Sequence, residues 1–188
     1  MLKTKNRKGE TMSILAPLLE YPDDNTLSIL DSIVEFLEKA CPEAAKKIAK
    51  FNHGISENNK DSLEELFTRT FDIAPLLCPY VTAHIYGDEN FDRGRLMSTL
   101  ASKFEEKGFV LKGELPDHIS VILKFAPYLD EEELDELNDF CLAEPVKQMH
   151  QTLKEADSPY SLVFDALSTI MKSKFKQKSQ DDKQGDRS

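Results

Sequence analysis

Apolar residues recur every three or four positions through most of this chain, and this spacing constrains the fold more than any other feature. In the clearest run, between Asn25 and Pro42, the recurring residues are Leu27, Leu30, Ile33, Val34 and Leu37. No part of the sequence shows the alternation of apolar and polar residues between hairpin turns that is typical of half-buried β-strands. The sequence therefore predicts an all-α fold, a single compact bundle of roughly eight to ten helices.

Capping residues and prolines predict where the helices begin and end. Ser62 with Glu65 and Asp130 with Glu133 have the spacing of a capping box, in which side chains bond the free amides of the first turn. Ser158-Pro159 is expected to begin the last helix. The expected helices cover residues 13–20, 25–41, 43–51, 62–71, 91–107, 116–128 and 130–141, then a segment that Pro145 restarts or kinks, and the last helix.

Both ends of the chain are polar and charged, with few apolar residues to bury. We therefore expect disordered tails at residues 1–12 and 173–188 around one helical domain, residues 13–172. A chain of 188 residues buries about 70% of its unfolded surface and needs no disulfide or metal to hold it together.

The charge of the chain is strongly acidic and unevenly distributed. The net charge is −10, and the body, residues 11–171, holds 30 acidic residues against 14 basic ones. Such a body repels the phosphates of nucleic acids and anionic lipids and attracts a cationic segment, so we expect no nucleic-acid partner. The alternative, which charge alone favours, is that these acids only keep the protein soluble.

The cysteines and the hydropathy pattern bear on location. Cys41, Cys78 and Cys141 are odd in number and far apart, which argues against a disulfide framework or a structural zinc site and fits a reducing compartment. No apolar run is long enough to cross a bilayer, and the basic N-terminus leads into Pro17 and acids rather than a signal sequence. We expect a cytoplasmic protein without direct membrane insertion.

The sequence offers few groups with the spacing of a catalytic or metal site. Glycine-rich phosphate loops are absent, and His53, His84, His118 and His150 lack the spacing of helical metal ligands. Asp117-His118 has the composition of a metal-phosphatase pair, and a metal-dependent hydrolase centred on it is one alternative. We favour the simpler interpretation, in which Pro116-Asp117 begins a helix. We therefore expect neither catalysis nor a bound metal or cofactor.

One stretch, residues 67–88, mixes aromatic, aliphatic, hydroxyl and imidazole groups around two prolines. Tyr80, His84 and Tyr86 are either core residues with satisfied polar ends or the lining of a peptide groove, and composition does not separate the two. The stretch has the character of a surface that binds another chain, with the rest of the sequence as its scaffold.

Three segments resemble a known family. They are Leu18-Leu19-Glu20-Tyr21-Pro22-Asp23; the block Thr70-Phe71-Asp72 and Leu76 to Asp88, followed by Arg93-Gly94; and Glu114-Leu115-Pro116-Asp117-His118 with Phe125. In this order and spacing they resemble the NarJ/TorD/DmsD chaperones of molybdoenzyme maturation, above all the NarJ branch, the delta subunit of respiratory nitrate reductase. Lys124 departs from the pattern, because an acid is expected there.

The resemblance implies an all-helical chaperone that binds the apo catalytic subunit of a nitrate-reductase-like enzyme. Binding would involve the basic N-terminal peptide of that client, and would hold it ready for molybdenum-cofactor insertion and complex assembly. A further alternative is a stable structural subunit of the finished complex, and both a monomer and a dimer are compatible with the family. The residues that the family pattern places at the client-peptide site are Phe67, Phe71, Asp72, Tyr80, His84, Tyr86, Asp88, Arg93, Glu114, Asp117 and His118.

Overall fold

The computed structural model describes residues 6–55, 60–87 and 91–175, and these residues form a bundle of helices around one core. The α-helices are α1 (Arg7–Ser13), α2 (Thr26–Ala40), α3 (Pro42–Gly54), α4 (Lys60–Phe67), α5 (Val81–Tyr86), α6 (Phe91–Lys107), α7 (Ile119–Phe125), α8 (Glu131–Leu137), α9 (Ala143–Glu155) and α10 (Tyr160–Lys172). Shorter 3-10 or π-helical turns are η1 (Ala16–Leu19), η3 (Thr68–Asp72), η4 (Ala126–Tyr128) and η5 (Asn138–Leu142). The described part contains no β-strand, only an isolated bridge, which confirms the all-α prediction.

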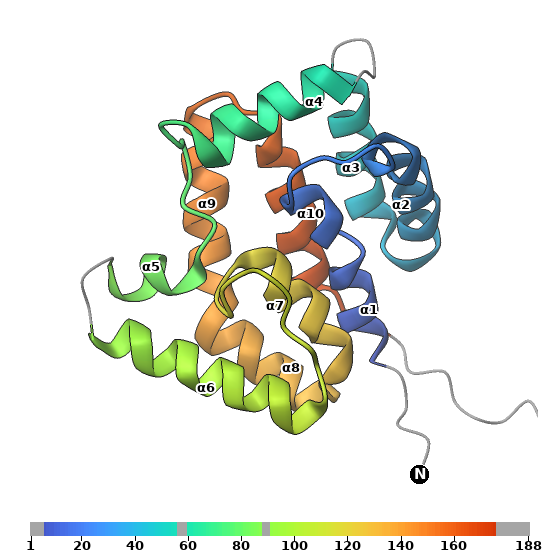
Figure 1. Cartoon of the computed structure of the whole chain (residues 1–188). Coiled ribbons are helices and arrows are strands. Elements are labelled where there is room, and N and C mark those ends of the chain that lie inside the picture. Colours follow the sequence, from blue (N-terminus) through green and yellow to red (C-terminus); the bar gives the residue numbers. More distant parts are fainter. Residues whose placement is uncertain (1–5, 56–59, 88–90, 176–188) are drawn as a thin grey trace, which may run out of the picture.

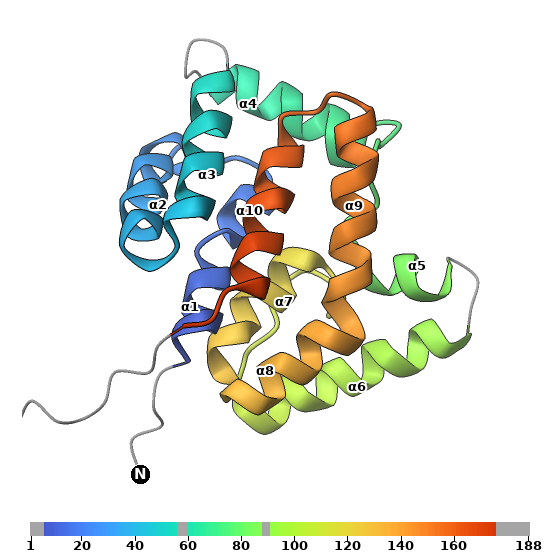
Figure 2. The same cartoon turned by 180° about the vertical axis from the view of Figure 1, so that it is seen from behind.

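Helix α10 lies at the centre of the bundle. It packs against α3 on one side and α9 on the other, and α2 covers α3 (Figures 1 and 2). Its inward residues, including Val163, Phe164 and Leu167, are fully buried. Around this centre, α4 crosses one end of the molecule and α6 crosses the opposite end (Figure 1).

The prediction of a disordered tail over residues 1–12 is wrong for residues 7–12, which belong to α1. Asn6 caps this helix by accepting a hydrogen bond from Gly9 N–H at 3.0 Å, and its Nδ2 donates to the backbone of Leu129 and Asp130. Gly9 lies against η4, where a Cβ would come within 2.7 Å of the carbonyl carbon of Ala126. The helix is therefore held by a close backbone approach and a cap, which an apolar pattern does not reveal.

Several predicted helix caps and helix boundaries also differ from those in the structure. The capping box of Asp130 with Glu133 is present, but Ser62 lies inside α4, and the buried hydroxyl of Ser158 makes no hydrogen bond in the described part of the chain. The predicted helix 116–128 begins only at Ile119, because His118 is extended and caps it. Residues 173–175 of the predicted C-terminal tail are described, and Phe175 packs against the core, so the tail prediction is wrong for them; residues 1–5 and 176–188 lie outside the described residues.

Within the described ranges, no helix combines the length and the apolar character that a bilayer crossing requires.

Candidate functional site

Two segments distant in sequence meet through their backbones. Val81 N–H donates to the carbonyl of Asp117, and Ile119 N–H donates to the carbonyl of Pro79, each at 2.9 Å. These bonds form an isolated antiparallel bridge between Tyr80 and His118. Tyr80 and His118 both have extended backbone angles, as they must to pair in this way. The bridge brings the side chains around Tyr80, Asp117 and His118 to one place.

Asp117 is the buried centre of this place, with no exposed surface. Its Oδ2 accepts a hydrogen bond from the Thr82 hydroxyl and lies 3.6 Å from Nη2 of Arg93. Arg93 Nε in turn donates to the Thr82 oxygen at 3.0 Å. Because a hydroxyl has a single proton, the bond from Arg93 leaves that proton for Asp117. The other carboxylate oxygen, Oδ1, is buried without a hydrogen-bond partner among the described residues.

Tyr80 and Glu114 extend this network toward the surface. Tyr80 Oη donates to Glu114 Oε1 at 3.1 Å, and the Arg93 guanidinium carbon lies 5.9 Å from the Tyr80 ring centroid, in cation–π range. Burial, together with the hydrogen bond and charge of Glu114, raises the pKa of Tyr80 to about 12. Tyr80 therefore stays neutral and serves as a hydrogen-bond donor. We call Tyr80, Thr82, Arg93, Glu114, Asp117 and His118 the Asp117 cluster.

The environment of His118 also disfavours its charged form. Its ring meets the Tyr80 ring edge-on at 5.3 Å, and its Nδ1 accepts a hydrogen bond from Ser120 N–H at 3.3 Å, which caps α7. Burial lowers the pKa of His118, against the opposing charges of nearby carboxylates such as Glu114. In the capped arrangement Nδ1 is an acceptor, and burial disfavours the charged ring.

Glu20 connects the first family-like segment to the third. Its Oε2 accepts a hydrogen bond from Lys124 Nζ at 2.6 Å, and its Oε1 accepts one from the Ser120 hydroxyl at 3.2 Å. The lysine that departs from the family pattern is thus paired with a carboxylate about one hundred residues away in sequence. Sequence reasoning missed Glu20, Thr82 and Ser120, although Glu20 and Thr82 lie inside the segments that carried the resemblance.

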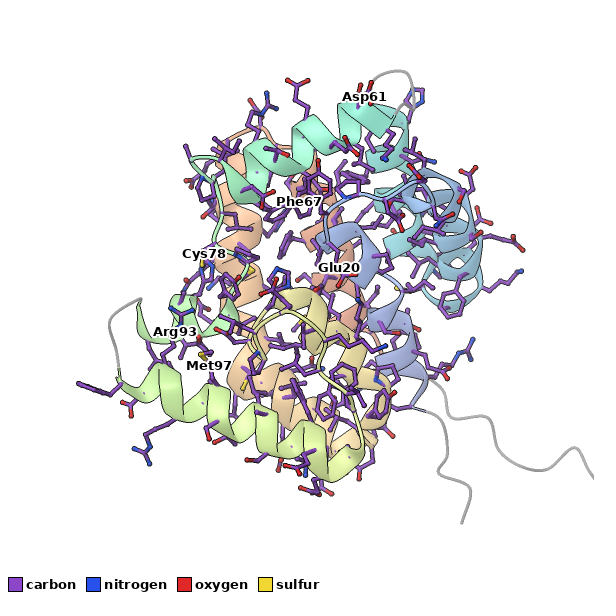
Figure 3. All side chains as sticks on the ribbon, in the orientation of Figure 1. Glu20, Asp61, Phe67, Cys78, Arg93 and Met97 are labelled. Atoms are coloured by element: carbon purple, nitrogen blue, oxygen red, sulfur yellow. The ribbon has the colours of Figure 1, made fainter. Side chains whose placement is uncertain are left out.

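Phe67 and Phe71 lie elsewhere, in an aromatic cluster. They are buried, their ring centroids are 4.9 Å apart, and Phe71 packs edge-on against Tyr160 at 4.9 Å. Phe67 also meets the edge of Tyr21, whose side chain is 56% exposed. In Figure 3, Phe67 lies beneath α4, whereas Cys78 and Arg93 lie around α5. The structure therefore separates these two rings from the Asp117 cluster.

The remaining candidates lie on or near the surface. Asp72 is exposed at the end of η3, and Tyr86 is 37% exposed at the end of α5. His84 is half-buried, with Nε2 2.8 Å from the carbonyl oxygen of Cys78. Asp88 lies outside the described residues.

The geometry does not assemble a metal site from these groups. Among the described residues, no three His, Cys, Asp or Glu side chains come together as metal ligands. Asp117 faces Thr82 and Arg93, whereas Nδ1 of His118 faces Ser120, so the two side chains do not converge on one point. The contacts that the structure gives these side chains hold segments together.

Comparison with known proteins gives three kinds of match. A family model described as the nitrate reductase delta subunit matches residues 35–166. The nitrate reductase molybdenum cofactor assembly chaperone NarJ of Escherichia coli K12 is 28% identical over 159 residues, as is NarJ of Escherichia coli O157:H7. These alignments cover 82% of this chain but 66% of each relative, so the chain spans about two thirds of their length.

The fold also matches a solved structure. A candidate redox enzyme maturation protein from Archaeoglobus fulgidus superposes with a TM-score of 0.64, over 92% of this chain and 98% of that one. At 18% sequence identity this match shows a shared fold.

Proposed function

The chain belongs to the nitrate reductase delta subunit family, and we propose that it is a chaperone for the catalytic subunit of a nitrate-reductase-like molybdoenzyme. In this proposal it binds the immature subunit, partly through a basic N-terminal peptide of that client. It then holds the client ready for molybdenum-cofactor insertion and for assembly of the complex. Binding takes place in the cytoplasm, before the client reaches its final complex.

The observation that carries this proposal is the way the Asp117 cluster joins the family-like segments. Asp117 and Thr82, which are buried, together with the partly exposed Arg93, hold the start of α5 and the start of α6 against the loop before α7. The half-buried residues Tyr80 and Glu114 lie at the edge of these contacts. A surface fixed in this way loses little conformational entropy when a peptide binds to it.

We propose that exposed and half-buried residues together give this surface the chemistry that a basic, amphipathic peptide requires. Tyr86 and Leu115 offer aromatic and aliphatic area, and Asp72 and Glu114 offer negative charge. Charge would steer the encounter and apolar contacts would hold the complex. We propose that Phe67 and Phe71 act indirectly, by supporting the exposed ring of Tyr21.

The relatives named in the comparisons are chaperones rather than catalysts. The groups of the Asp117 cluster fit that role, because each is engaged by a neighbour in the folded chain. Tyr80 has a pKa raised to about 12, and burial lowers the pKa of His118. We therefore assign no reaction to this chain.

Affinity capture from cells that make the client enzyme tests the proposal. The tagged chain should retain the catalytic subunit from cells unable to make molybdenum cofactor, and should release it when the cofactor is supplied. Glu114→Lys should weaken this capture, because it places a like charge opposite the basic peptide, whereas Glu155→Lys, an exposed charge change on α9, should not. Stable retention of the mature, cofactor-loaded enzyme would instead indicate a structural subunit.

A further inference from the structure

A second recess lies away from the Asp117 cluster, between α6 and the region of α8 and η5. Both views place α6 and α8 next to each other at the same end of the molecule (Figures 1 and 2). The groove between them has a volume of about 420 Å³, and its apolar lining comes from Leu96, Leu100, Phe125, Leu129, Leu137 and Phe140. Phe140 stands at its edge with 80% of its surface exposed. We call this recess the α6–α8 groove.

Ion pairs across the α6–α8 groove fix its two walls. Glu133 on α8 lies 2.6 Å from Lys107 Nζ and 3.0 Å from Lys103 Nζ, both on α6. Burial alone would raise the pKa of Glu133, but the bonds from Lys107, the Asp130 amide and Lys103 outweigh it and lower the pKa to about 2. Lys103 also pairs with Glu106 on the same helix, so Glu133 and Glu106 together balance the charges of Lys103 and Lys107.

The acidic residues beside the α6–α8 groove give this face of the molecule a negative charge. Phe140 is shared with an adjoining shallow hollow, whose other lining residues are Glu131, Glu132, Asp135, Glu136 and Asp139. Within the described part of the chain, Glu132, Glu136 and Asp139 make no ion pair. An apolar groove beside such acids repels anionic lipid, nucleic acid and a second copy of the same face, and attracts a cationic chain.

The structure of the walls favours a helical occupant. An extended peptide gains affinity by hydrogen-bonding to free backbone groups at a sheet edge. Both long walls of this groove are helical, and the backbone groups within a helix are already hydrogen-bonded to each other. A helix satisfies its own backbone and can place apolar side chains along one face. The π-helical turn η5, which carries Phe140, is a local irregularity of a kind frequent at functional sites.

We propose that the α6–α8 groove binds a cationic amphipathic helix of a partner protein. The apolar face of that helix fills the groove against Leu100 and Phe140, and its lysines or arginines lie against Glu136 and Asp139. None of these residues belongs to the Asp117 cluster, so the inference does not depend on the proposed client. It gives the chain a second docking surface, separate from the first.

The test uses a fluorescently labelled peptide of about 16 residues, long enough to form a helix on binding, built from leucine, alanine and lysine with leucine on one face. Its binding is followed by fluorescence anisotropy at low and high salt. Phe140→Ala should raise the dissociation constant about tenfold, because it removes the exposed aromatic ring against which the peptide helix packs. Phe91→Ala, which removes the same side chain from a 95% exposed position on α6, should leave it unchanged.

Charge reversal tests the electrostatic part. Glu136→Lys combined with Asp139→Lys should raise the dissociation constant about tenfold at low salt, and this difference should shrink as salt is added. The matched control, Glu38→Lys with Glu155→Lys, changes the net charge equally at exposed positions on α2 and α9 and should have little effect. A peptide with glutamate in place of lysine should not bind.

Three results would overturn the assignment. Equal binding by Phe140→Ala and Phe91→Ala would show that the peptide does not use the groove. A concentration-dependent dimer of the wild-type chain that Phe140→Ala abolishes would assign the groove to a second copy. Tighter peptide binding after removal of residues 1–5, which precede Asn6 beside Leu129, would assign it to the chain's own N-terminal segment.

Discussion

The ion pair between Arg93 and Asp117 gives the sharpest prediction about the Asp117 cluster. Asp117 is fully buried and the Arg93 side chain is 21% exposed, with 3.6 Å between Nη2 and Oδ2. At an effective dielectric constant of about 20, two unit charges at this distance attract by about 4–5 kcal/mol, before the cost of desolvation. Removing Arg93 leaves the buried carboxylate with the Thr82 hydroxyl and one unbonded oxygen. We therefore expect Arg93→Met to lower the free energy of unfolding by about 3 kcal/mol.

A double-mutant cycle separates the ion pair from other effects of the substitution. Asp117→Asn keeps an oxygen for Thr82 but removes the charge, so in that background Arg93→Met should cost only about 1 kcal/mol. The coupling energy between the two positions should therefore be about 2 kcal/mol. Arg95→Met is the matched control, because Arg95 is on the same helix and its pair with Asp92 is exposed. It should cost less than about 0.5 kcal/mol.

The assay is urea unfolding followed by far-UV circular dichroism, with the slope of each transition compared among variants. A cost for Arg93→Met that matches the cost for Arg95→Met would refute the reasoning, and so would costs that simply add in the double variant. Either result would mean that the pair contributes no more than a surface contact.

Three further predictions address stability. Thr82→Val removes the hydroxyl that bonds both charged groups and should lower the free energy of unfolding by about 1–3 kcal/mol in the same assay. An unchanged midpoint would contradict this role of the hydroxyl. Since burial lowers the pKa of His118, the unfolded chain binds its proton more readily, so the free energy of unfolding should fall between about pH 7 and about pH 5. His118→Gln should reduce that slope, and an identical slope would rule out this histidine as its source. Gly9→Ala forces a methyl group against Ala126 and should lower the free energy of unfolding by about 1–3 kcal/mol, measured by thermal unfolding. The control Gly94→Ala, in open space on α6, should be neutral or stabilising. Equal effects would show that α1 can move away from Ala126.

The sequence predicts elements well where local rules decide them. Residues 91–107 form α6 with the predicted bounds, and the capping box of Asp130 with Glu133 is present, whereas Ser62, which has the same spacing to Glu65, lies inside α4. The prediction failed for α1, which is held by Asn6 bonding to Leu129 and by Gly9 lying against Ala126 of η4, both more than one hundred residues later. Tertiary contacts of this kind leave no periodic pattern.

For the candidate site too, the sequence predicted some features correctly and missed others. The family-like segments brought Tyr80, Arg93, Glu114, Asp117 and His118 into one list, and the structure places these five together. The pattern could not separate a ring that lines a surface from a ring that fills a core, because both need an aromatic residue at helical spacing. Phe67 and Phe71 were therefore grouped with residues from which the fold separates them.

Calorimetric titration of the chain with a synthetic N-terminal peptide of the client's catalytic subunit tests the central claim most directly. The account predicts saturable binding that weakens with salt and is lost in Tyr86→Ala, while Tyr128→Ala, a 43% exposed tyrosine in η4, binds like the wild type. Equal affinity in both variants, or no binding by the folded wild-type chain, would contradict it.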